Sequence, residues 1–164
     1  MRNLNPVVAA EHARIEQTTL ARMLEKGTVD RQSYINYLRS SLTVWIVLEA
    51  KFDLAKELGV ADRLLADLLG MTDDMDMRKA SDAAKVHAAR VREADLRVLG
   101  LGLCYGGKTM AKRIRENTRF PFSHFHMPEG AREKLREIDA PQADVIEAFA
   151  RTTEWYRDAV NERD

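Results

Sequence analysis

Helix start and stop signals divide the whole chain, and they constrain its fold more than any other feature. Asn5-Pro6 is typical of an N-cap followed by a first-turn proline, and Gly27 is typical of a helix end. Asp30 caps a second helix, which we expect to run to about Leu58 and to stop at Gly59. The inner face of that helix carries apolar residues at three- and four-residue spacing: Tyr34, Leu38, Leu42, Trp45, Leu48 and Phe52.

The middle of the chain carries signals of the same kind. A short helix is expected from about Asp62 to Leu69, ending at Gly70, and residues 71–77 form a loop. Ser81-Asp82 starts another long helix, and the segment 119–130, with Phe-Pro-Phe and Met-Pro, cannot continue a helix. The apolar residues expected on the long helix are Val86, Val91, Leu96 and Leu99.

The last signals complete an all-helical pattern. A short helix ends near Ile138, and Asp139 to Gln142 resembles a capping box that opens the final helix. Strand signals are scarce, and 164 residues fit one domain. We therefore expect a single-domain, all-α helical bundle over residues 1–164, with five or six helices joined by short loops.

Charge and cysteine content narrow the class of protein. Lysine plus arginine equals aspartate plus glutamate at 26 each, so no global charge favours nucleic acid or a membrane surface. The single cysteine, Cys104, excludes an intrachain disulfide and a thiolate metal cluster. The N-terminal residues lack the apolar stretch of a secretory signal. We expect a cytoplasmic protein, a monomer or weak dimer, with neither nucleic acid nor membrane as partner.

A histidine and a glutamate stand one turn apart near the N-terminus. On a helix, His12 falls within the apolar arc of Val8 and Ile15, and Glu16 lies on the same face. A carboxylate that accepts one ring N–H fixes the tautomer and orientation of a metal-bound imidazole. The spacing alone also suits an ordinary histidine at the core boundary, so both readings stay open on the pair by itself.

The surrounding residues resemble the opening of the haem oxygenases. Glu11-His12-Ala13-Arg14-Ile15-Glu16 is followed by Lys26-Gly27, Tyr34 and Leu48-Glu49; Gly27 comes fifteen positions after His12, and Glu49 twenty-two after Gly27. In that family a proximal histidine with a glutamate four residues on precedes a basic-Gly turn, an aromatic residue and Leu-Glu. The resemblance implies that His12 is the ligand of the haem iron and that Glu16 orients it.

A glycine-rich stretch, Gly100-Leu101-Gly102-Leu103-Cys104-Tyr105-Gly106-Gly107-Lys108, is the second signal. Each glycine in a helix costs about 1 kcal/mol relative to alanine, so something must offset them. A bare helix backbone against a flat ligand would do so, as would close packing of two helices. A dinucleotide-binding loop is a third reading, but it needs a preceding strand where this sequence predicts a helix.

The resemblance favours the flat ligand. Haem oxygenases carry a distal helix with Gly-x-x-x-Gly-Gly over the haem, followed by basic residues, and Gly102, Gly106 and Gly107 with Lys108 are similar to it. Many members place an aspartate after the first of these glycines, where it orders a distal water network. Leu103 occupies that position here. The network is then built from backbone and other groups, or oxygen activation is impaired.

Other cationic and histidine side chains are candidates for supporting roles. The resemblance implies that Arg132 binds a haem propionate, with Arg97 and Lys108 as further candidates, although solvated side chains are the plain alternative. His124 and His126 lie in an aromatic loop, where His126 could donate to a distal water. We expect both to be ordinary, partly exposed residues, and His87 to lie on a helix surface.

Taken with the resemblance, the sequence predicts a haem oxygenase that cleaves haem to biliverdin, iron and carbon monoxide. Haem is then both substrate and cofactor, and molecular oxygen is the co-substrate. Electrons come from outside, from a ferredoxin or a reductase, because no flavin or nicotinamide motif is present. Two alternatives remain: a non-catalytic haem-binding or haem-delivery protein, suggested by Leu103, and a thiaminase-like or di-iron member of the same helical superfamily.

Overall fold

The computed structural model describes residues 6–93, 101–137 and 140–161, and for residues 101–107 and 136 it describes the backbone alone. The secondary structure of these residues is helical, as predicted. Their α-helices are α1 (Pro6–Glu16), α2 (Thr19–Lys26), α3 (Arg31–Lys51), α4 (Asp53–Leu58), α5 (Val60–Met71), α6 (Asp82–Glu93), α7 (Leu101–Asn117), α8 (Ala131–Arg136) and α9 (Gln142–Ala159). Two short 3₁₀ turns, η1 (Met77–Lys79) and η3 (Ser123–Phe125), lie between them.

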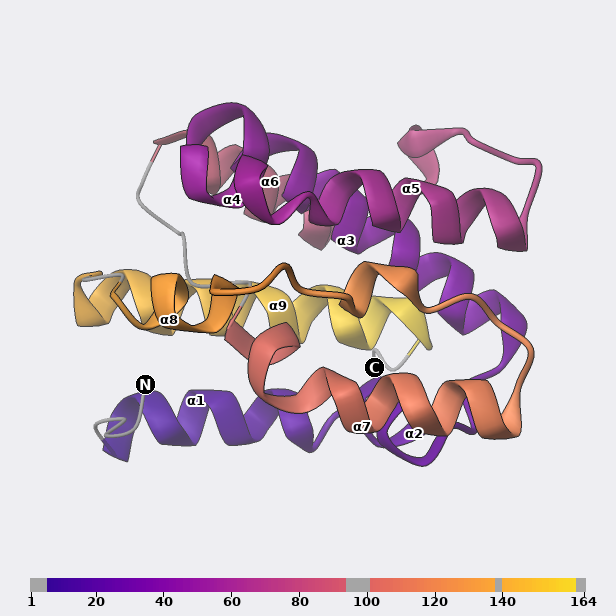
Figure 1. Ribbon diagram of the computed structural model, residues 1–164. Helices are drawn as coiled ribbons and strands as arrows, with labels where there is room; N and C mark the ends of the chain where they lie inside the picture. The colour runs from indigo at the N-terminus through magenta and orange to yellow at the C-terminus, as the bar shows by residue number, and fades with distance from the viewer. Residues whose placement is uncertain (1–5, 94–100, 138–139, 162–164) are drawn as a thin grey trace.

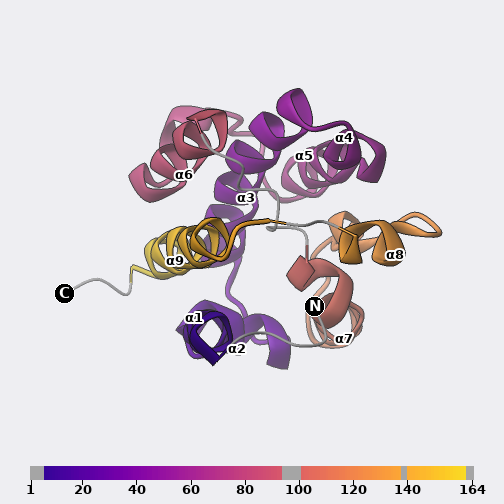
Figure 2. The same ribbon diagram turned by 90° about the vertical axis from the view of Figure 1, so that its left-hand side faces the viewer.

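The helices form three layers (Figures 1 and 2). Helices α3, α4, α5 and α6 lie in the upper layer, where α5 and α6 pack on α3. Helices α8 and α9 lie in the middle, and α9 contacts α3 and α6 above and α1 below. Helices α1, α2 and α7 form the lower layer, where α7 packs on α2. Helix α9 therefore joins the N-terminal helix to the rest of the bundle.

The first expected helix is divided in two. Residues 17 and 18 interrupt it, and Thr18 becomes the N-cap of α2: its Oγ1 accepts a hydrogen bond from the Ala21 N–H at 3.2 Å and donates one to the Ile15 carbonyl at 2.7 Å. A threonine hydroxyl competes with the backbone for such bonds, which is why threonine favours helix starts. The break separates the helix that carries His12 from the one that ends at Gly27.

Gly27 ends α2 as predicted, and a neighbouring helix makes glycine necessary there. Its φ of 70° is left-handed, and a Cβ would lie 2.4 Å from the Arg113 carbonyl oxygen of α7. Asn117 at the end of α7 donates to the Lys26 carbonyl at 3.0 Å. The Lys-Gly turn therefore serves as the surface on which α7 docks.

The second expected helix also has a break. Asp30 caps α3 by accepting from the Ser33 N–H at 3.0 Å, as predicted, and Gly59 ends α4 with a φ of 63°. The helix does not run through to Leu58, because Phe52 adopts an extended backbone (φ −124°, ψ 123°). That residue redirects the chain, so that α4 turns back over the end of α3.

Two later boundaries differ from the predictions. Helix α5 runs to Met71, so Gly70 lies inside it rather than at its end. Helix α9 begins at Gln142 with Pro141 at the N-cap, two residues later than the Asp139 start that was expected. Asp139 and Ile138, named for the end of α8 and this cap, lie outside the described residues.

The long helix after Ser81 buries a different face from the one expected. Val86 is 45% exposed, whereas Ala84, His87, Ala88 and Val91 are buried. The small alanine side chains allow α6 to approach α3 and α9 closely, which a face of branched residues would prevent. Val91 lies on the core side as predicted, and Leu96 and Leu99 lie outside the described residues.

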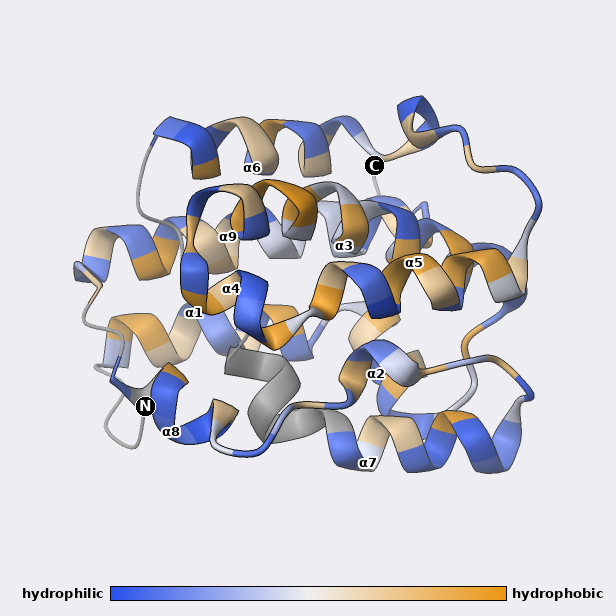
Figure 3. Ribbon diagram, turned by 45° about the horizontal axis from the view of Figure 1, so that its top comes forward, coloured by the Kyte–Doolittle hydropathy of each residue, from blue (hydrophilic) through white to orange (hydrophobic). Residues whose placement is uncertain are grey.

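Apolar side chains from all of these α-helices meet in one core. The predicted apolar face of the second helix is confirmed. Its five residues on α3 are buried, and Phe52, which follows α3, packs against the core from its edge. Orange and blue alternate along α5 and α6 in Figure 3, as in helices that bury one side. Every helix of the described ranges is too short or too polar to cross a lipid bilayer.

Candidate haem site

The His12–Glu16 pair forms as its spacing predicts. His12 Nδ1 lies 2.8 Å from Glu16 Oε1, one turn along α1. A carboxylate only accepts hydrogen bonds, so Nδ1 carries a proton, and in the neutral imidazole Nε2 presents its lone pair. This tautomer is the one that binds a metal through Nε2.

The surroundings of His12 leave it open to a ligand. Its side chain is 36% exposed and Glu16 is 66% exposed. The imidazole lies edge-on to Phe149 of α9, with 5.4 Å between ring centroids and 63° between planes. Phe149 is buried, so one side of the histidine is fixed by the bundle while the rest remains accessible.

The glycine-rich stretch is helical. Gly102, Leu103, Gly106 and Gly107 all belong to the first turns of α7, so the dinucleotide-loop reading is wrong. Helices α1 and α7 lie in the same layer below α9 (Figures 1 and 2). Since the side chains of residues 101–107 are not described, the approach of these glycines to a ligand held by His12 stays a prediction.

The three candidate cations have different locations. Lys108 is exposed on α7 directly after Gly107, and Arg132 is exposed in the first turn of α8, which contacts α7. Arg97 lies outside the described residues. Their binding of carboxylates also stays a prediction.

The chemistry of the side chains at His12 suits a haem better than a bare metal ion. Across the part of the chain that the structure describes, no group of three or more His, Cys, Asp or Glu side chains is placed to hold a metal ion. A haem brings four nitrogen ligands of its own and needs only one axial donor from the protein. His12 Nε2, with Nδ1 held by Glu16, provides such a donor.

A second histidine–carboxylate pair lies in the core, where the sequence did not predict one. His124 is fully buried rather than partly exposed, and its Nδ1 lies 2.6 Å from Asp67 Oδ2 of α5. Asp67 also accepts from the backbone N–H of His124 at 2.8 Å and from Ser123 N and Oγ at 3.0 and 2.5 Å. The other ring nitrogen, Nε2, lies 2.9 Å from the hydroxyl of Tyr37.

These contacts fix the protonation of the pair. Burial alone would raise the pKa of Asp67, but the hydrogen bonds from His124 and Ser123 hold it below its usual value. Burial lowers the pKa of His124 despite the neighbouring carboxylate. The result is a neutral imidazole on an ionised aspartate, which ties the 3₁₀ turn η3 to α5 and α3.

Asp67 could have been found from the sequence. It follows Leu64 by three residues and Val60 by seven, in the middle of the apolar face of α5. A lone carboxylate at such a position needs buried donors. The partner, 57 residues away, could not be identified from spacing. His126, by contrast, is exposed, in line with the expectation for that residue.

His87 lies in the core rather than on a helix surface. It accepts a hydrogen bond at Nδ1 from Trp155 Nε1 at 3.0 Å, and its Nε2 has no partner among the described residues. Burial lowers the pKa of His87 to about 4. Trp155 and Phe149 pack the interior of the bundle, as expected for the aromatic residues of the final helix.

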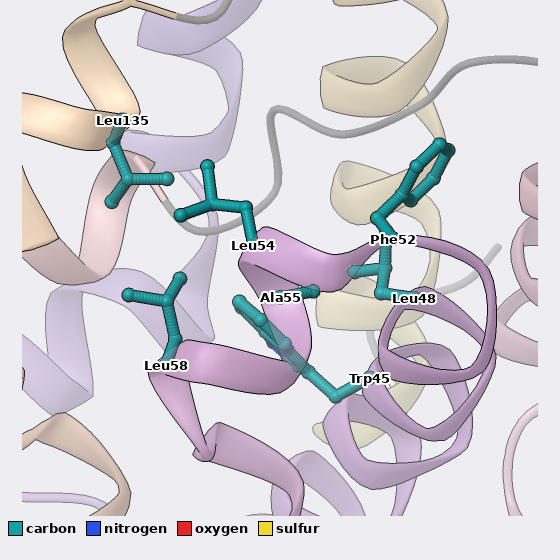
Figure 4. A pocket seen from close by; sticks show the side chains of 7 residues that line it. All are labelled: Trp45, Leu48, Phe52, Leu54, Ala55, Leu58 and Leu135. Carbon is teal, nitrogen blue, oxygen red and sulfur yellow. The ribbon is translucent and has the colours of Figure 1, made fainter.

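A small apolar pocket lies where α3, α4 and α8 meet (Figure 4). It is lined by Trp45, Leu48, Phe52, Leu54, Ala55, Leu58 and Leu135. Phe52, where the helix breaks, lies at one edge of the pocket near Leu48 (Figure 4). No lining residue comes from α1, so this pocket is separate from the site predicted around His12.

Known proteins resemble this chain in structure but hardly in sequence. No protein-family model matches the chain, and no curated protein matches it in sequence. Among solved structures, the haem oxygenase from Leptospira interrogans superposes with a TM-score of 0.76 at 18% identity, covering 93% of this chain and 95% of that one.

Two cyanobacterial structures from Synechocystis are also similar. Haem oxygenase-1 in complex with haem has a TM-score of 0.69 at 21% identity, covering 95% of this chain and 90% of that one. Haem oxygenase-2 in complex with haem and NO has a TM-score of 0.71 at 16% identity, covering 96% and 86%. The chain therefore has the all-helical fold of the haem oxygenases, as the sequence predicted.

Proposed function

We propose that this protein is a haem oxygenase, which cleaves haem to biliverdin, iron and carbon monoxide with electrons from an external donor. The observation that carries the proposal is the His12–Glu16 pair, with Nδ1 held at 2.8 Å and Nε2 open, in a chain with the haem-oxygenase fold. The Synechocystis proteins of the same fold are described in complex with haem.

In this proposal His12 Nε2 holds the iron, and Glu16 keeps the imidazole in the required tautomer. Phe149 restricts rotation of the ring from the α9 side. Arg132 and Lys108 bind the propionates, as does Arg97 from outside the described residues. The bound haem supplies the iron that binds and activates molecular oxygen.

The first turns of α7 complete the proposed site on the opposite face. Gly102, Gly106 and Gly107 bring no side chain, so the helix backbone can approach a flat ligand closely. Leu103 offers no polar group, so an ordered distal water must be held by backbone groups or other side chains. Electrons are delivered by a ferredoxin or reductase, and the compartment we propose is the cytoplasm.

A turnover assay separates the enzyme from its main alternative. The haem complex is incubated in air with ascorbate and followed by absorption spectroscopy. For an oxygenase, the Soret band is lost while bilin or verdohaem bands rise and carbon monoxide is released. A stable Soret band, together with normal haem binding, would instead establish a non-catalytic haem-binding or haem-delivery protein, the role that Leu103 favours.

A further inference from the structure

Two stacked tyrosines of α3 differ in what their hydroxyl groups face. Tyr34 and Tyr37 lie one turn apart with ring centroids at 5.8 Å, and both are buried. The Tyr34 hydroxyl donates to the Pro121 carbonyl at 2.6 Å, whereas that of Tyr37 lies 2.9 Å from His124 Nε2. A carbonyl oxygen is a very weak base, and an imidazole nitrogen is a good one. The two buried phenols therefore differ mainly in the base that their hydroxyl groups face.

The direction of the second hydrogen bond follows from the contacts of His124. Its Nδ1 is 2.6 Å from an ionised carboxylate, so Nδ1 carries the proton and Nε2 is an acceptor. Tyr37 therefore donates to His124, and the order of groups is phenol, neutral imidazole, carboxylate. Burial raises the pKa of Tyr37 well above its ordinary value, so the phenol keeps its proton at rest.

Loss of an electron reverses this preference, because an oxidised phenol is a strong acid. A phenol that can pass its proton to a hydrogen-bonded base gives up an electron more easily than one that faces only a carbonyl. We propose that Tyr37 is a redox-active tyrosine, which transfers its phenolic proton to His124 as its ring gives one electron to a one-electron oxidant.

The step balances within the three residues and the oxidant. The Tyr37 O–H bond breaks, an N–H bond forms at His124 Nε2, and one electron reduces the oxidant. The products are a neutral tyrosyl radical and an imidazolium whose charge is balanced by Asp67. Return of an electron from a reductant sends the proton back to Tyr37.

Helix α9 lies between Tyr37 and His12 and contacts both residues. Trp155 and Tyr156 contact Tyr37 with centroid distances of 6.5 and 5.9 Å, and the half-buried Tyr156 leads toward the surface. Phe149, which touches His12, stands six residues before Trp155, or about 9 Å along the helix axis. An oxidised iron held by His12, as in the proposed function, would be a one-electron oxidant on the other side of α9.

Photochemical oxidation of the haem-free, full-length chain tests the proposal without depending on the proposed function. A ruthenium tris-bipyridine complex, oxidised by flash and quencher, removes one electron from the protein, and the radical is trapped by freezing for electron paramagnetic resonance. We expect a neutral tyrosyl signal that is lost in Tyr37→Phe and retained in Tyr34→Phe, the matched control. Its formation should be slower in D₂O, because the O–H bond breaks in the same step.

The opposite results would overturn the assignment. A signal that survives in Tyr37→Phe, one that disappears in Tyr34→Phe, or an equal rate in H₂O and D₂O would each exclude Tyr37 as the proton-coupled donor. His124→Gln provides the second variant, since an amide nitrogen cannot take the proton. It should lose the radical while the circular dichroism spectrum stays that of the wild type, and if it unfolds, the isotope effect on the wild type decides.

Discussion

Two histidine–carboxylate pairs in this protein use the same groups at nearly the same distance and have opposite surroundings. His12 and Glu16 are 2.8 Å apart on one exposed helix, and His124 and Asp67 are 2.6 Å apart between two elements of the core. In the first pair, Nε2 has no protein partner among the described residues. In the second, both ring nitrogens are occupied. The first pair can accept a ligand, and the second holds the fold together.

The difference shows that a carboxylate partner alone does not identify a metal-binding histidine. It fixes the tautomer in both cases, and what decides the role is the state of the other nitrogen. His87 adds a third case, in which Nδ1 accepts from Trp155 and Nε2 is enclosed. Among the histidines of the described ranges, only His12 has a ring N–H held by a carboxylate and a second nitrogen without a protein partner.

The largest expected effect is the loss of haem ligation in His12→Ala. The variant should lack the five-coordinate haem spectrum, because no other described side chain supplies a donor at that position. Since the residue is partly exposed, stability should change by no more than about 0.5 kcal/mol. Haem titration followed in the Soret region measures the first effect and urea denaturation the second.

Added imidazole sharpens this test. It should restore a histidine-like haem spectrum in His12→Ala, because the ligand fills the space left by the ring. His126→Ala, which changes an exposed histidine just after the 3₁₀ turn η3, is the matched control and should bind haem as the wild type does. A wild-type spectrum in His12→Ala would reject the ligand assignment.

The second-largest effect is a loss of stability when the buried His124–Asp67 pair is broken. Asp67→Ala should lower the free energy of unfolding by about 3–5 kcal/mol, because it removes the partner of His124 and leaves buried donors unsatisfied. Urea denaturation with a constant slope measures it. Glu16→Ala, the same change in the exposed pair, should cost less than about 1 kcal/mol. Equal losses in the two variants would contradict the contrast.

The exposed pair could be predicted from the sequence, and the buried pair could not. His12 and Glu16 are four residues apart, so helical periodicity alone placed them together. Asp67 and His124 are 57 residues apart, and their contact depends on how the 119–130 loop crosses α5, which no local pattern specifies. The apolar pattern also continues through the two breaks, one made by the local cap at Thr18 and the other by the extended backbone at Phe52, so it does not predict either of them.

The third effect is a dependence of stability on pH, caused by His87. Burial lowers its pKa in the folded state to about 4 from a usual 6.5, so the unfolded chain binds the proton more tightly. Stability is then complete above about pH 6.5 and falls as the pH drops toward 4, by about 3 kcal/mol in all.

Chemical denaturation at a series of pH values measures this loss. His87→Gln keeps an acceptor for Trp155 Nε1 but cannot titrate, so the slope between pH 4 and 6.5 should become shallower. His126→Gln removes an exposed histidine and should leave the slope unchanged. A variant with the full wild-type slope at position 87 would show that another group is responsible.

The smallest expected effect concerns the partner of His12. Glu16→Ala leaves the imidazole in place but removes the acceptor of its Nδ1–H, so the ring is no longer held in one tautomer or orientation. Haem affinity should fall by about 10- to 100-fold, the usual cost of losing such a partner.

Glu16→Gln keeps an oxygen acceptor without the charge and should retain more of the affinity. Haem titration of both variants beside Glu11→Ala, the change of a nearby glutamate whose carboxylate pairs with Arg14, separates the hydrogen bond from the net charge of α1. If all three bind haem equally well, the carboxylate does not orient the ligand, and the exposed pair is no more than a surface contact between adjacent turns.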